Sequence, residues 1–416
     1  MSEQSPNIET LLLHGVPPPD RESGATIPPI FQSSAFGYPS AEALEAVFAG
    51  REAGYVYTRI NNPTVDHFER RLNRLEGGIG AMACASGMAA ITATILALAE
   101  AGDELVSSNS IFGGTYSLFQ DTLSRCGIRT RFVEATDLDA YRGALRDRTK
   151  LIFVETIGNP KLDVPDIAAL GRLAREYGIA LVVDNTVTTP IVVRPKELGA
   201  DIVVHSASKF ISGQGHAIGG VIVDCGTCDW SNPRYEILRP FYRRVQQFAL
   251  LAALRNQVAR NLGGCLAPFN AFLLSMGLET LGVRMERHCA NAAEVAAFLA
   301  AHPKVEGISY PGLETHPDHH LANRQFSGRY GALVTLRLGT KERCFRFINR
   351  LRLVKNLANL GDTRTLVIHP ASTLCRDLNA AERLAMGVTD DLVRLSVGIE
   401  DPADILDDLS RSLDGL

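Results

Sequence analysis

One lysine, Lys209, lies among small and hydroxylated residues that follow an apolar run. The stretch reads DIVVHSASKFISGQGHAIGGVIVD over residues 201–224, and it predicts a strand, a small-residue turn and a second strand. A lysine amine can capture a carbonyl group, and the hydroxyls of Ser206 and Ser208 can bond a phosphate. These features favour pyridoxal phosphate, the cofactor commonly held in this way. The alternative is a solvated lysine after a strand, and this stretch by itself leaves both open.

Two further segments suit the phosphate and the ring of such a cofactor. Ala85-Ser86-Gly87-Met88 opens a predicted helix, whose first amides form an anion site, and glycine lets a phosphate approach closely. Asp184 ends the apolar run ALVVD, so it is expected at the carboxyl end of a strand, where α/β proteins bind ligands. An aspartate there keeps a pyridine nitrogen protonated. Many helices begin with Ser-Gly and many turns are capped by aspartate, so each feature also has a purely structural interpretation.

Residues at three other positions could bind anionic groups. Tyr57 and Arg59, in YTRINNPT, are two apart in a predicted extended segment and so share a face suited to a phosphate. Arg394 lies within the apolar run LVRLSVG, and a buried arginine needs a partner. A substrate carboxylate bound bidentately would serve, and a structural salt bridge is the alternative.

The elements that must position these residues form an arm and two domains. Residues 1–60 are rich in proline and predict an extended arm, which lies on its own body or on a neighbouring subunit. In residues 61–260 short Val/Ile-rich runs alternate with helical segments, which predicts a mostly parallel α/β sheet with helices on both faces. In residues 261–416 a long helical stretch precedes the strand-like runs RYGALVTLRL, FRFINRL, TLVIHPA and LVRLSVGIE. We expect a smaller α+β domain built on an antiparallel sheet there.

Composition and charge limit the class of protein. The chain has 416 residues, of which 46% are hydrophobic and 21% charged, as is ordinary for a globular domain protein. The formal net charge is −4, too weak to argue for nucleic-acid or membrane partners. The polar N-terminus MSEQSPNIET lacks a signal segment, and no apolar run is long enough for a membrane span. We therefore expect a cytoplasmic protein.

Cysteine and histidine spacing does not predict a metal site. Only Cys225 and Cys228 of the eight cysteines make a CxxC pair, and no second pair or histidine partner lies at zinc-finger spacing. His316, His319 and His320 form a cluster in a polar, proline-containing stretch, for which a loop is favoured over a metal site. We expect no metal.

Together these motifs resemble the Cys/Met-metabolism family of pyridoxal-phosphate enzymes, the trans-sulfuration or γ-family of fold type I. The resemblance covers nearly the whole chain, through GATIPPIFQSSAF, YTRINNPT, ASGMAA, ETIGNP, VVDNT, SASKF, PFNAFLLSMGLETLGVRMERH, IHPAST and RLSVGIED. It implies the fold type I architecture, with a mostly parallel sheet domain and a smaller C-terminal α+β domain. It also implies a homodimer, paired into a homotetramer, in which the arm contacts the neighbouring subunit.

The resemblance implies a role for each candidate residue. Lys209 is expected to hold the cofactor covalently and then to act as the base, and Asp184 to pair with the pyridine nitrogen. His205 is expected to be a packed core histidine. The phosphate is expected to be held by residues of the same subunit, namely Ser86, Gly87, Met88, Ser206 and Ser208, and by Tyr57 and Arg59 of the neighbouring subunit. Asn159 is expected near the ring hydroxyl, and Phe112 is expected to stack on the ring. The residues expected to contact the substrate are Arg394, Asn359 and Tyr57.

Two positions depart from the family pattern in ways that bear on the substrate. The family usually has a tyrosine at position 112, which helps proton transfer to the leaving group. Phe112 keeps the stacking ring but lacks the hydroxyl. Gly114 stands where methionine γ-lyases carry a cysteine. Because acetate leaves as a stabilised carboxylate and needs little protonation, both changes favour an acetyl-ester substrate.

The stretch NLGDTRTLVIHPAST at 359–373 looks like that of O-acetylhomoserine sulfhydrylases. We therefore expect a transferase that catalyses γ-replacement, from O-acetyl-L-homoserine and sulfide or a small thiol to homocysteine or methionine and acetate, as in methionine biosynthesis. Against this, the region around 230–250 looks shorter than in many of those enzymes. The alternatives are a methionine γ-lyase, a cystathionine γ-synthase or lyase, and a catalytically inactive binding or assembly protein on the same fold. The last is disfavoured because every expected chemical residue except the tyrosine at 112 is present.

Overall fold

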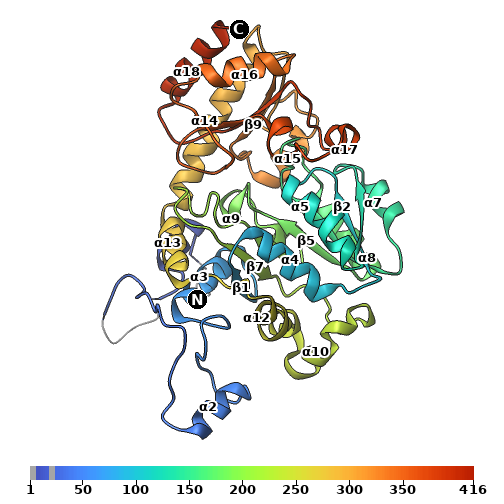
Figure 1. Ribbon diagram of the computed structural model, residues 1–416, viewed down its shortest axis with the longest axis vertical. Coiled ribbons are helices and arrows are strands. Elements are labelled where there is room, and N and C mark those ends of the chain that lie inside the picture. Colours follow the sequence, from blue (N-terminus) through green and yellow to red (C-terminus); the bar gives the residue numbers. More distant parts are fainter. Residues whose placement is uncertain (1–5, 18–23) are drawn as a thin grey trace.

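The computed structural model describes residues 6–17 and 24–416, so part of the predicted arm, at 18–23, lies outside the described residues. The centre of the molecule is a seven-stranded sheet with strand order β1-β7-β6-β5-β4-β2-β3 (Figure 1). Only β7 runs against the other six, which confirms the mostly parallel sheet. The strands are β1 (Gly80–Cys84), β2 (Glu104–Ser108), β3 (Arg129–Val133), β4 (Thr149–Glu155), β5 (Ala180–Asp184), β6 (Ile202–His205) and β7 (Gly220–Asp224).

Both faces of this sheet are buried under helices. Along β4, Leu151 and Phe153 belong to one hydrophobic core, whereas Ile152 and Val154 belong to the other. The helices α3 (Pro63–Glu76) and α8 (Ile167–Tyr177) cover one face, and α4 (Gly87–Leu98) and α11 (Ala249–Ala253) cover the other. Double burial explains why these strands are apolar at consecutive positions.

The C-terminal part is built on a second sheet, of five strands, seen at the top of Figure 1. Its neighbours are antiparallel except for the parallel pair β10 and β11. The strands are β8 (Gly307–Ser309), β9 (Leu333–Arg337), β10 (Lys355–Asn356), β11 (Leu366–Ile368) and β12 (Leu392–Ser396). The two sheets lie on either side of residue 261, where we propose the domain boundary.

One predicted strand of this part is wrong. FRFINRL lies in the helix α16 (Lys341–Arg350). The buried residues of that helix are Cys344, Phe347 and Ile348, a spacing of three and four that matches one face of a helix. The predicted long helical stretch is present, but it forms two helices, α13 (Pro268–Glu279) and α14 (Leu281–Ala301).

The sequence predicted an extended N-terminal arm, but the described part of the arm is only partly extended. It contains the helices α1 (Ile8–His14) and α2 (Ala41–Phe48). The first packs on its own body, where Leu11 and Leu12 are buried. The second projects from the lower end of the molecule in Figure 1 and buries none of its residues.

Short helices complete the fold: α5 (Gly113–Ser117), α6 (Leu123–Arg125), α7 (Leu138–Ala144), α9 (Thr189–Val192), α10 (Arg239–Val245), α12 (Ala259–Leu262), α15 (His319–Phe326), α17 (Ala380–Ala385) and the longer α18 (Pro402–Asp414). Among the described residues, we find no helix with both the length and the apolar character required to span a bilayer.

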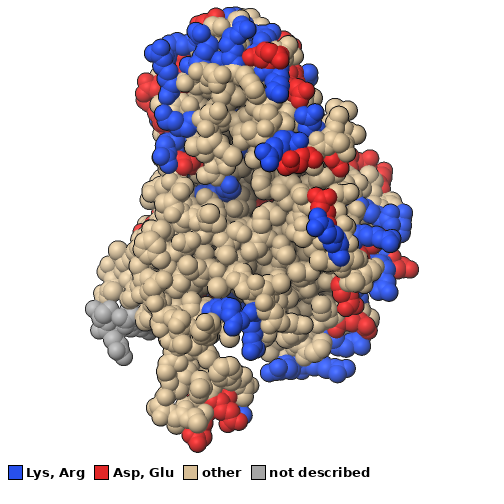
Figure 2. All heavy atoms as spheres, viewed as in Figure 1, with Lys and Arg blue, Asp and Glu red and all other residues tan. Residues whose placement is uncertain are grey.

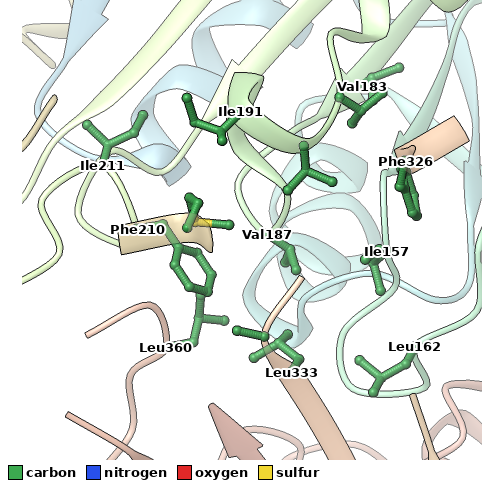
Figure 3. Close-up of a cluster of buried hydrophobic side chains, with 14 of the residues drawn as sticks. Ile157, Leu162, Val183, Val187, Ile191, Phe210, Ile211, Phe326, Leu333 and Leu360 are labelled. Carbon is green, nitrogen blue, oxygen red and sulfur yellow. The ribbon is translucent and has the colours of Figure 1, made fainter. Parts of the chain in front are cut away.

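A hydrophobic cluster joins the two sheets at the turn that carries Lys209, residues 206–219 between β6 and β7, here called the lysine turn. Figure 3 shows Phe210, Leu360 and Leu333 pointing toward one another, the first from the turn after Lys209, the last from β9. All three are nearly or fully buried. The turn that carries Lys209 is therefore packed against the C-terminal part of the chain.

Candidate active site

A cavity of about 500 Å³ opens at the carboxyl ends of β4, β5 and β6, beside the start of α4. Parallel sheets bind ligands at this edge. All the predicted site positions except Tyr57 and Arg59 line it. They are Ser86, Gly87, Met88, Phe112, Asn159, Asp184, Ser206, Ser208, Lys209, Asn359 and Arg394.

Lys209 lies partly buried in the cavity wall. Its Nζ donates to Asn359 Oδ1 at 2.6 Å. Burial, and then the positive charge of Arg394, lower the pKa of Lys209 to about 8. An amine with a pKa near neutrality can both release and accept a proton during a reaction. The solvated-lysine alternative therefore fails.

Asp184 is the last residue of β5 and lines the cavity. One of its two carboxylate oxygens accepts hydrogen bonds from the protein. Its Oδ1 accepts from the backbone N of Thr186 at 2.9 Å and also from the Thr186 hydroxyl. That hydroxyl oxygen in turn accepts from the backbone N of Ser206 at 2.8 Å. Thr186 thus ties the ends of β5 and β6 together and fixes the direction of the carboxyl group. Burial raises the pKa of Asp184, so the group gains from a cationic partner.

Glu155 is a cavity residue that sequence reasoning missed. It ends β4 and pairs in register with Asp184, and its Oε1 accepts from the backbone N of Phe112 at 2.6 Å. Burial, and then the charge of Asp184, raise the pKa of Glu155 well above its usual value. The signal was available, because ETIGNP follows an apolar strand just as the aspartate does in ALVVD.

The start of α4 forms a polar end of the cavity. Ser86 caps the helix, its Oγ accepting from Ala89 N at 3.1 Å, and the amides of the first turn have no acceptor within the helix. A Cβ on Gly87 would lie 2.6 Å from the Cβ of Ser206, so only glycine lets these two segments meet. Ser208 is partly engaged elsewhere, since its hydroxyl exchanges hydrogen bonds with the backbone of Gly219 at 3.0 and 3.1 Å.

Arg394 also lines the cavity and is 2% exposed. Its guanidinium donates to Asn159 Oδ1 at 2.8 Å and to the backbone oxygen of Asn359 at 2.9 Å. Its buried Nε has no hydrogen-bond partner, and within the described ranges no carboxylate forms a salt bridge with it. Burial lowers its pKa to about 10. A buried cation in this state is suited to bind a carboxylate that enters the cavity.

Tyr57 and Arg59 lie outside the cavity of their own chain. The Arg59 guanidinium is 5.4 Å from the centroid of the Tyr57 ring and donates to the backbone oxygen of Arg260.

His205 also lies outside the cavity. It is buried with its Nε2 2.6 Å from Glu76 Oε1, as expected for a core histidine. In the part of the chain that the structure describes, no group of three His, Cys, Asp or Glu side chains could hold a metal ion.

These groups fit pyridoxal phosphate. The open amides of α4 suit a phosphate, Asp184 suits a protonated pyridine nitrogen, and the Lys209 amine suits the aldehyde. A family model described as Cys/Met metabolism PLP-dependent enzyme matches residues 9–414. The chain belongs to this family.

Relatives and a solved structure in the Cys/Met metabolism family extend the match. The chain is 41% identical to the O-acetyl-L-homoserine sulfhydrylase of Leptospira meyeri over 97% of this chain and 96% of that one. It is 38% identical to the L-methionine gamma-lyase of Pseudomonas putida over 99% and 98%. A Campylobacter jejuni structure, described as an O-acetylhomoserine (thiol)-lyase with N'-pyridoxyl-lysine-5'-monophosphate, has a TM-score of 0.94 at 36% identity and covers 98% of this chain and 100% of that one. The predicted family, fold type and cofactor are confirmed.

Within this family member, Phe112 and Gly114 depend on each other. A Cβ on Gly114 would lie 2.6 Å from Cε1 of the Phe112 ring. The cysteine of methionine γ-lyases therefore cannot be placed at 114 while Phe112 keeps its position. Tyr116 does not replace the missing hydroxyl, because it stacks on Phe132 with the ring centroids 4.4 Å apart and does not line the cavity.

We predict that Gly114→Ala displaces the Phe112 ring and weakens pyridoxal-phosphate binding about tenfold, as overpacking at a tight contact costs on the order of 1–3 kcal/mol. Cofactor titration followed by absorbance measures the effect. Gly143→Ala is the matched control, because a Cβ there meets no atom within 4 Å. Cofactor affinity in Gly114→Ala equal to that of the control would contradict the steric account.

Proposed function

We propose that this protein is a pyridoxal-phosphate-dependent transferase that catalyses γ-replacement. O-Acetyl-L-homoserine and sulfide, or a small thiol, give homocysteine or methionine and acetate. The observation that carries the proposal is that Phe112 lines the same cavity as Lys209 and Arg394. Phe112 has an aromatic ring but no hydroxyl that could donate a proton to the leaving group. The name of the Leptospira meyeri relative supports the same reaction.

The residues of the cavity divide the work of binding. Arg394, held by Asn159 and Asn359, would bind the substrate carboxylate. The α4 amides with Ser206 and Ser208 would hold the phosphate, and Asp184 would keep the pyridine nitrogen protonated. When bound, pyridoxal phosphate supplies an electron-withdrawing ring that lowers the barrier to breaking bonds at the substrate's α-carbon.

Lys209 would move the protons. It is the amine in the cavity with a pKa near 8, so at neutral pH it can take a proton from Cα, return it, and act at Cβ. Asn359 Oδ1 accepts from its Nζ and so fixes where the amine points. Acetate then leaves from Cγ and the sulfur nucleophile adds to the same carbon. Phe112 would pack on the ring and exclude water without donating a proton.

We predict that O-acetylhomoserine with sulfide is turned over faster than methionine alone. The reason is that acetate departs without a proton donor, whereas a thiolate lacks the help that a hydroxyl at 112 would give. The assay compares homocysteine formation from the ester with 2-oxobutyrate release from methionine.

Two variants test the residues in the same assay. Phe112→Tyr should raise methionine cleavage and change acetate release little, and Lys209→Ala should lower both rates by several orders of magnitude.

The alternative is a methionine γ-lyase, and the full-length similarity to the Pseudomonas putida relative is the observation that supports it. Faster 2-oxobutyrate release from methionine than homocysteine formation from the ester would establish the lyase and defeat the transferase. Near-normal turnover in Lys209→Ala would remove that residue from the mechanism in either case.

We also propose that the active unit is a homodimer, paired into a homotetramer, with Tyr57 and Arg59 completing the site of the neighbouring subunit. Three observations support this. Tyr57 and Arg59 lie outside their own cavity, and α2 exposes Leu44 and Phe48. On the face seen in Figure 2, the charged residues gather at the top, at the right and along the lower edge, and the middle and left are largely uncharged. A location in the cytoplasm, where small amino-acid substrates are available, remains part of the proposal.

The shared site predicts complementation between two inactive variants. Lys209→Ala lacks the base and Arg59→Ala lacks the group lent to the neighbour, so a mixed dimer contains one intact site. After subunit exchange, verified by mass spectrometry of the mixed species, the mixture should regain up to about a quarter of the wild-type activity. A mixture that has exchanged but stays inactive would mean that Arg59 serves its own subunit.

A further inference from the structure

The turn that follows Lys209 is fastened to the loop that carries Asn359. Within the turn, Gly213 N donates to Lys209 O at 2.8 Å. Between the turn and the loop, Thr363 N donates to Gly213 O at 2.7 Å, and Arg364 Nη2 donates to Gln214 O at 3.2 Å. These contacts join a segment of the central domain to a segment of the C-terminal domain.

The contact of Arg364 with Gln214 depends on a bidentate ion pair between Arg364 and Asp362. Arg364 Nε lies 2.8 Å from Asp362 Oδ1, and Arg364 Nη2 lies 3.1 Å from Asp362 Oδ2. The Arg364 backbone N also donates to Oδ1 at 3.0 Å. The Asp362 side chain is only 5% exposed although that of Arg364 is 61% exposed. Bidentate pairs with a buried carboxylate hold their geometry better than ordinary surface pairs.

The turn packs directly on this pair. A Cβ on Gly215 would lie 2.9 Å from Asp362 Oδ2, and Gly215 lines the cavity. The same loop is pinned on its other side, since Gly361 N donates to Ser396 Oγ at 2.9 Å. Ser396 ends β12, the strand that carries Arg394. A shift of the loop would therefore move Asn359 relative to Lys209.

We propose that Asp362 and Arg364 are positioning residues for the reaction, which clamp the lysine turn to the loop of Asn359 and so hold Asn359 Oδ1 against Lys209 Nζ. The inference rests on the proposed role of Lys209 as the base. It assigns a task to a salt bridge that faces solvent on one side and does not line the cavity. Because the Asp362 carboxylate is buried, its replacement can also change stability, so the test reads the geometry of the amine in variants shown to be folded.

The chain provides a matched control for this pair. Arg337 Nε lies 2.9 Å from Asp391 Oδ2, and the side chains of Arg337 and Asp391 are 56% and 9% exposed. This pair is in the same domain, but it does not contact the lysine turn. The test compares Asp362→Asn and Arg364→Gln with Asp391→Asn, after thermal denaturation has shown that all three are folded.

Two readouts need no substrate. Hydrogen exchange in the full-length holoenzyme should be about tenfold faster at the amides of Ser212 and Gly213 in both clamp variants, and unchanged in Asp391→Asn. In the apoenzyme, labelling of Lys209 by an amine-reactive reagent should titrate near pH 8 in the wild type. It should titrate at lower pH in the clamp variants, because Asn359 Oδ1 no longer stabilises the ammonium form.

Turnover supplies the third readout. In the clamp variants kcat should fall about tenfold with a smaller change in KM, and Asp362→Asn/Arg364→Gln should be no worse than either single variant, because the two residues act as one unit. Exchange and labelling at wild-type values, or equal effects in Asp391→Asn, would overturn the proposal. Because exchange and labelling are independent of the substrate, they fail only if the clamp is wrong, whereas the wrong substrate alters turnover alone.

Discussion

The structure depends on keeping an amine, a guanidinium and two carboxyl groups in one buried cavity. Isolated charges are costly to bury, and here each lacks a full counterion within the described residues. Burial and the charge of Arg394 lower the pKa of Lys209, burial lowers the pKa of Arg394, and burial and the charge of Asp184 raise the pKa of Glu155. An amino acid with a carboxylate, and a cofactor with a cationic ring nitrogen and an anionic phosphate, together supply the missing partners. The site is thus electrostatically incomplete in a way that matches the ligands of the family.

The fold makes this arrangement tolerable by fixing each group through the backbone. The carboxyls stand at the ends of neighbouring parallel strands, in register. The proposed phosphate site is the start of a twelve-residue helix, α4. The lysine turn is anchored by its own buried Phe210 and by Arg284, whose guanidinium donates to the backbone oxygens of Phe210 and Gly277 at 2.6 and 2.7 Å. The side chains that do chemistry are therefore placed by elements whose own stability comes from the two hydrophobic cores.

Much of this could be predicted from the sequence, because parallel strands buried on both faces leave uninterrupted apolar runs, and the polar residues that end them lie at the cavity. Asp184 and Lys209 were found by that rule, and Glu155 could have been. FRFINRL was misread because apolar and basic residues alternate over a few positions in a helix as well as in a strand. The contact of Asn359 with Lys209 and that of Arg364 with Gln214 each join residues 150 positions apart, and Asn359 and Arg394 are 35 positions apart. Contacts at such separations leave no local pattern in the sequence. The roles of Tyr57 and Arg59 depend on a second subunit and remain predictions.

The central claim is that Lys209 is the amine that holds the cofactor opposite Asp184. Reduction of the holoenzyme with borohydride fixes pyridoxal phosphate to whichever lysine carries it, and mass spectrometry of the digested protein then locates the modified residue. The account predicts one phosphopyridoxyl group per chain, on Lys209, and none on any lysine in Lys209→Ala treated in the same way. A modified lysine elsewhere, or a wild-type protein that remains unmodified after saturation with the cofactor, would contradict it.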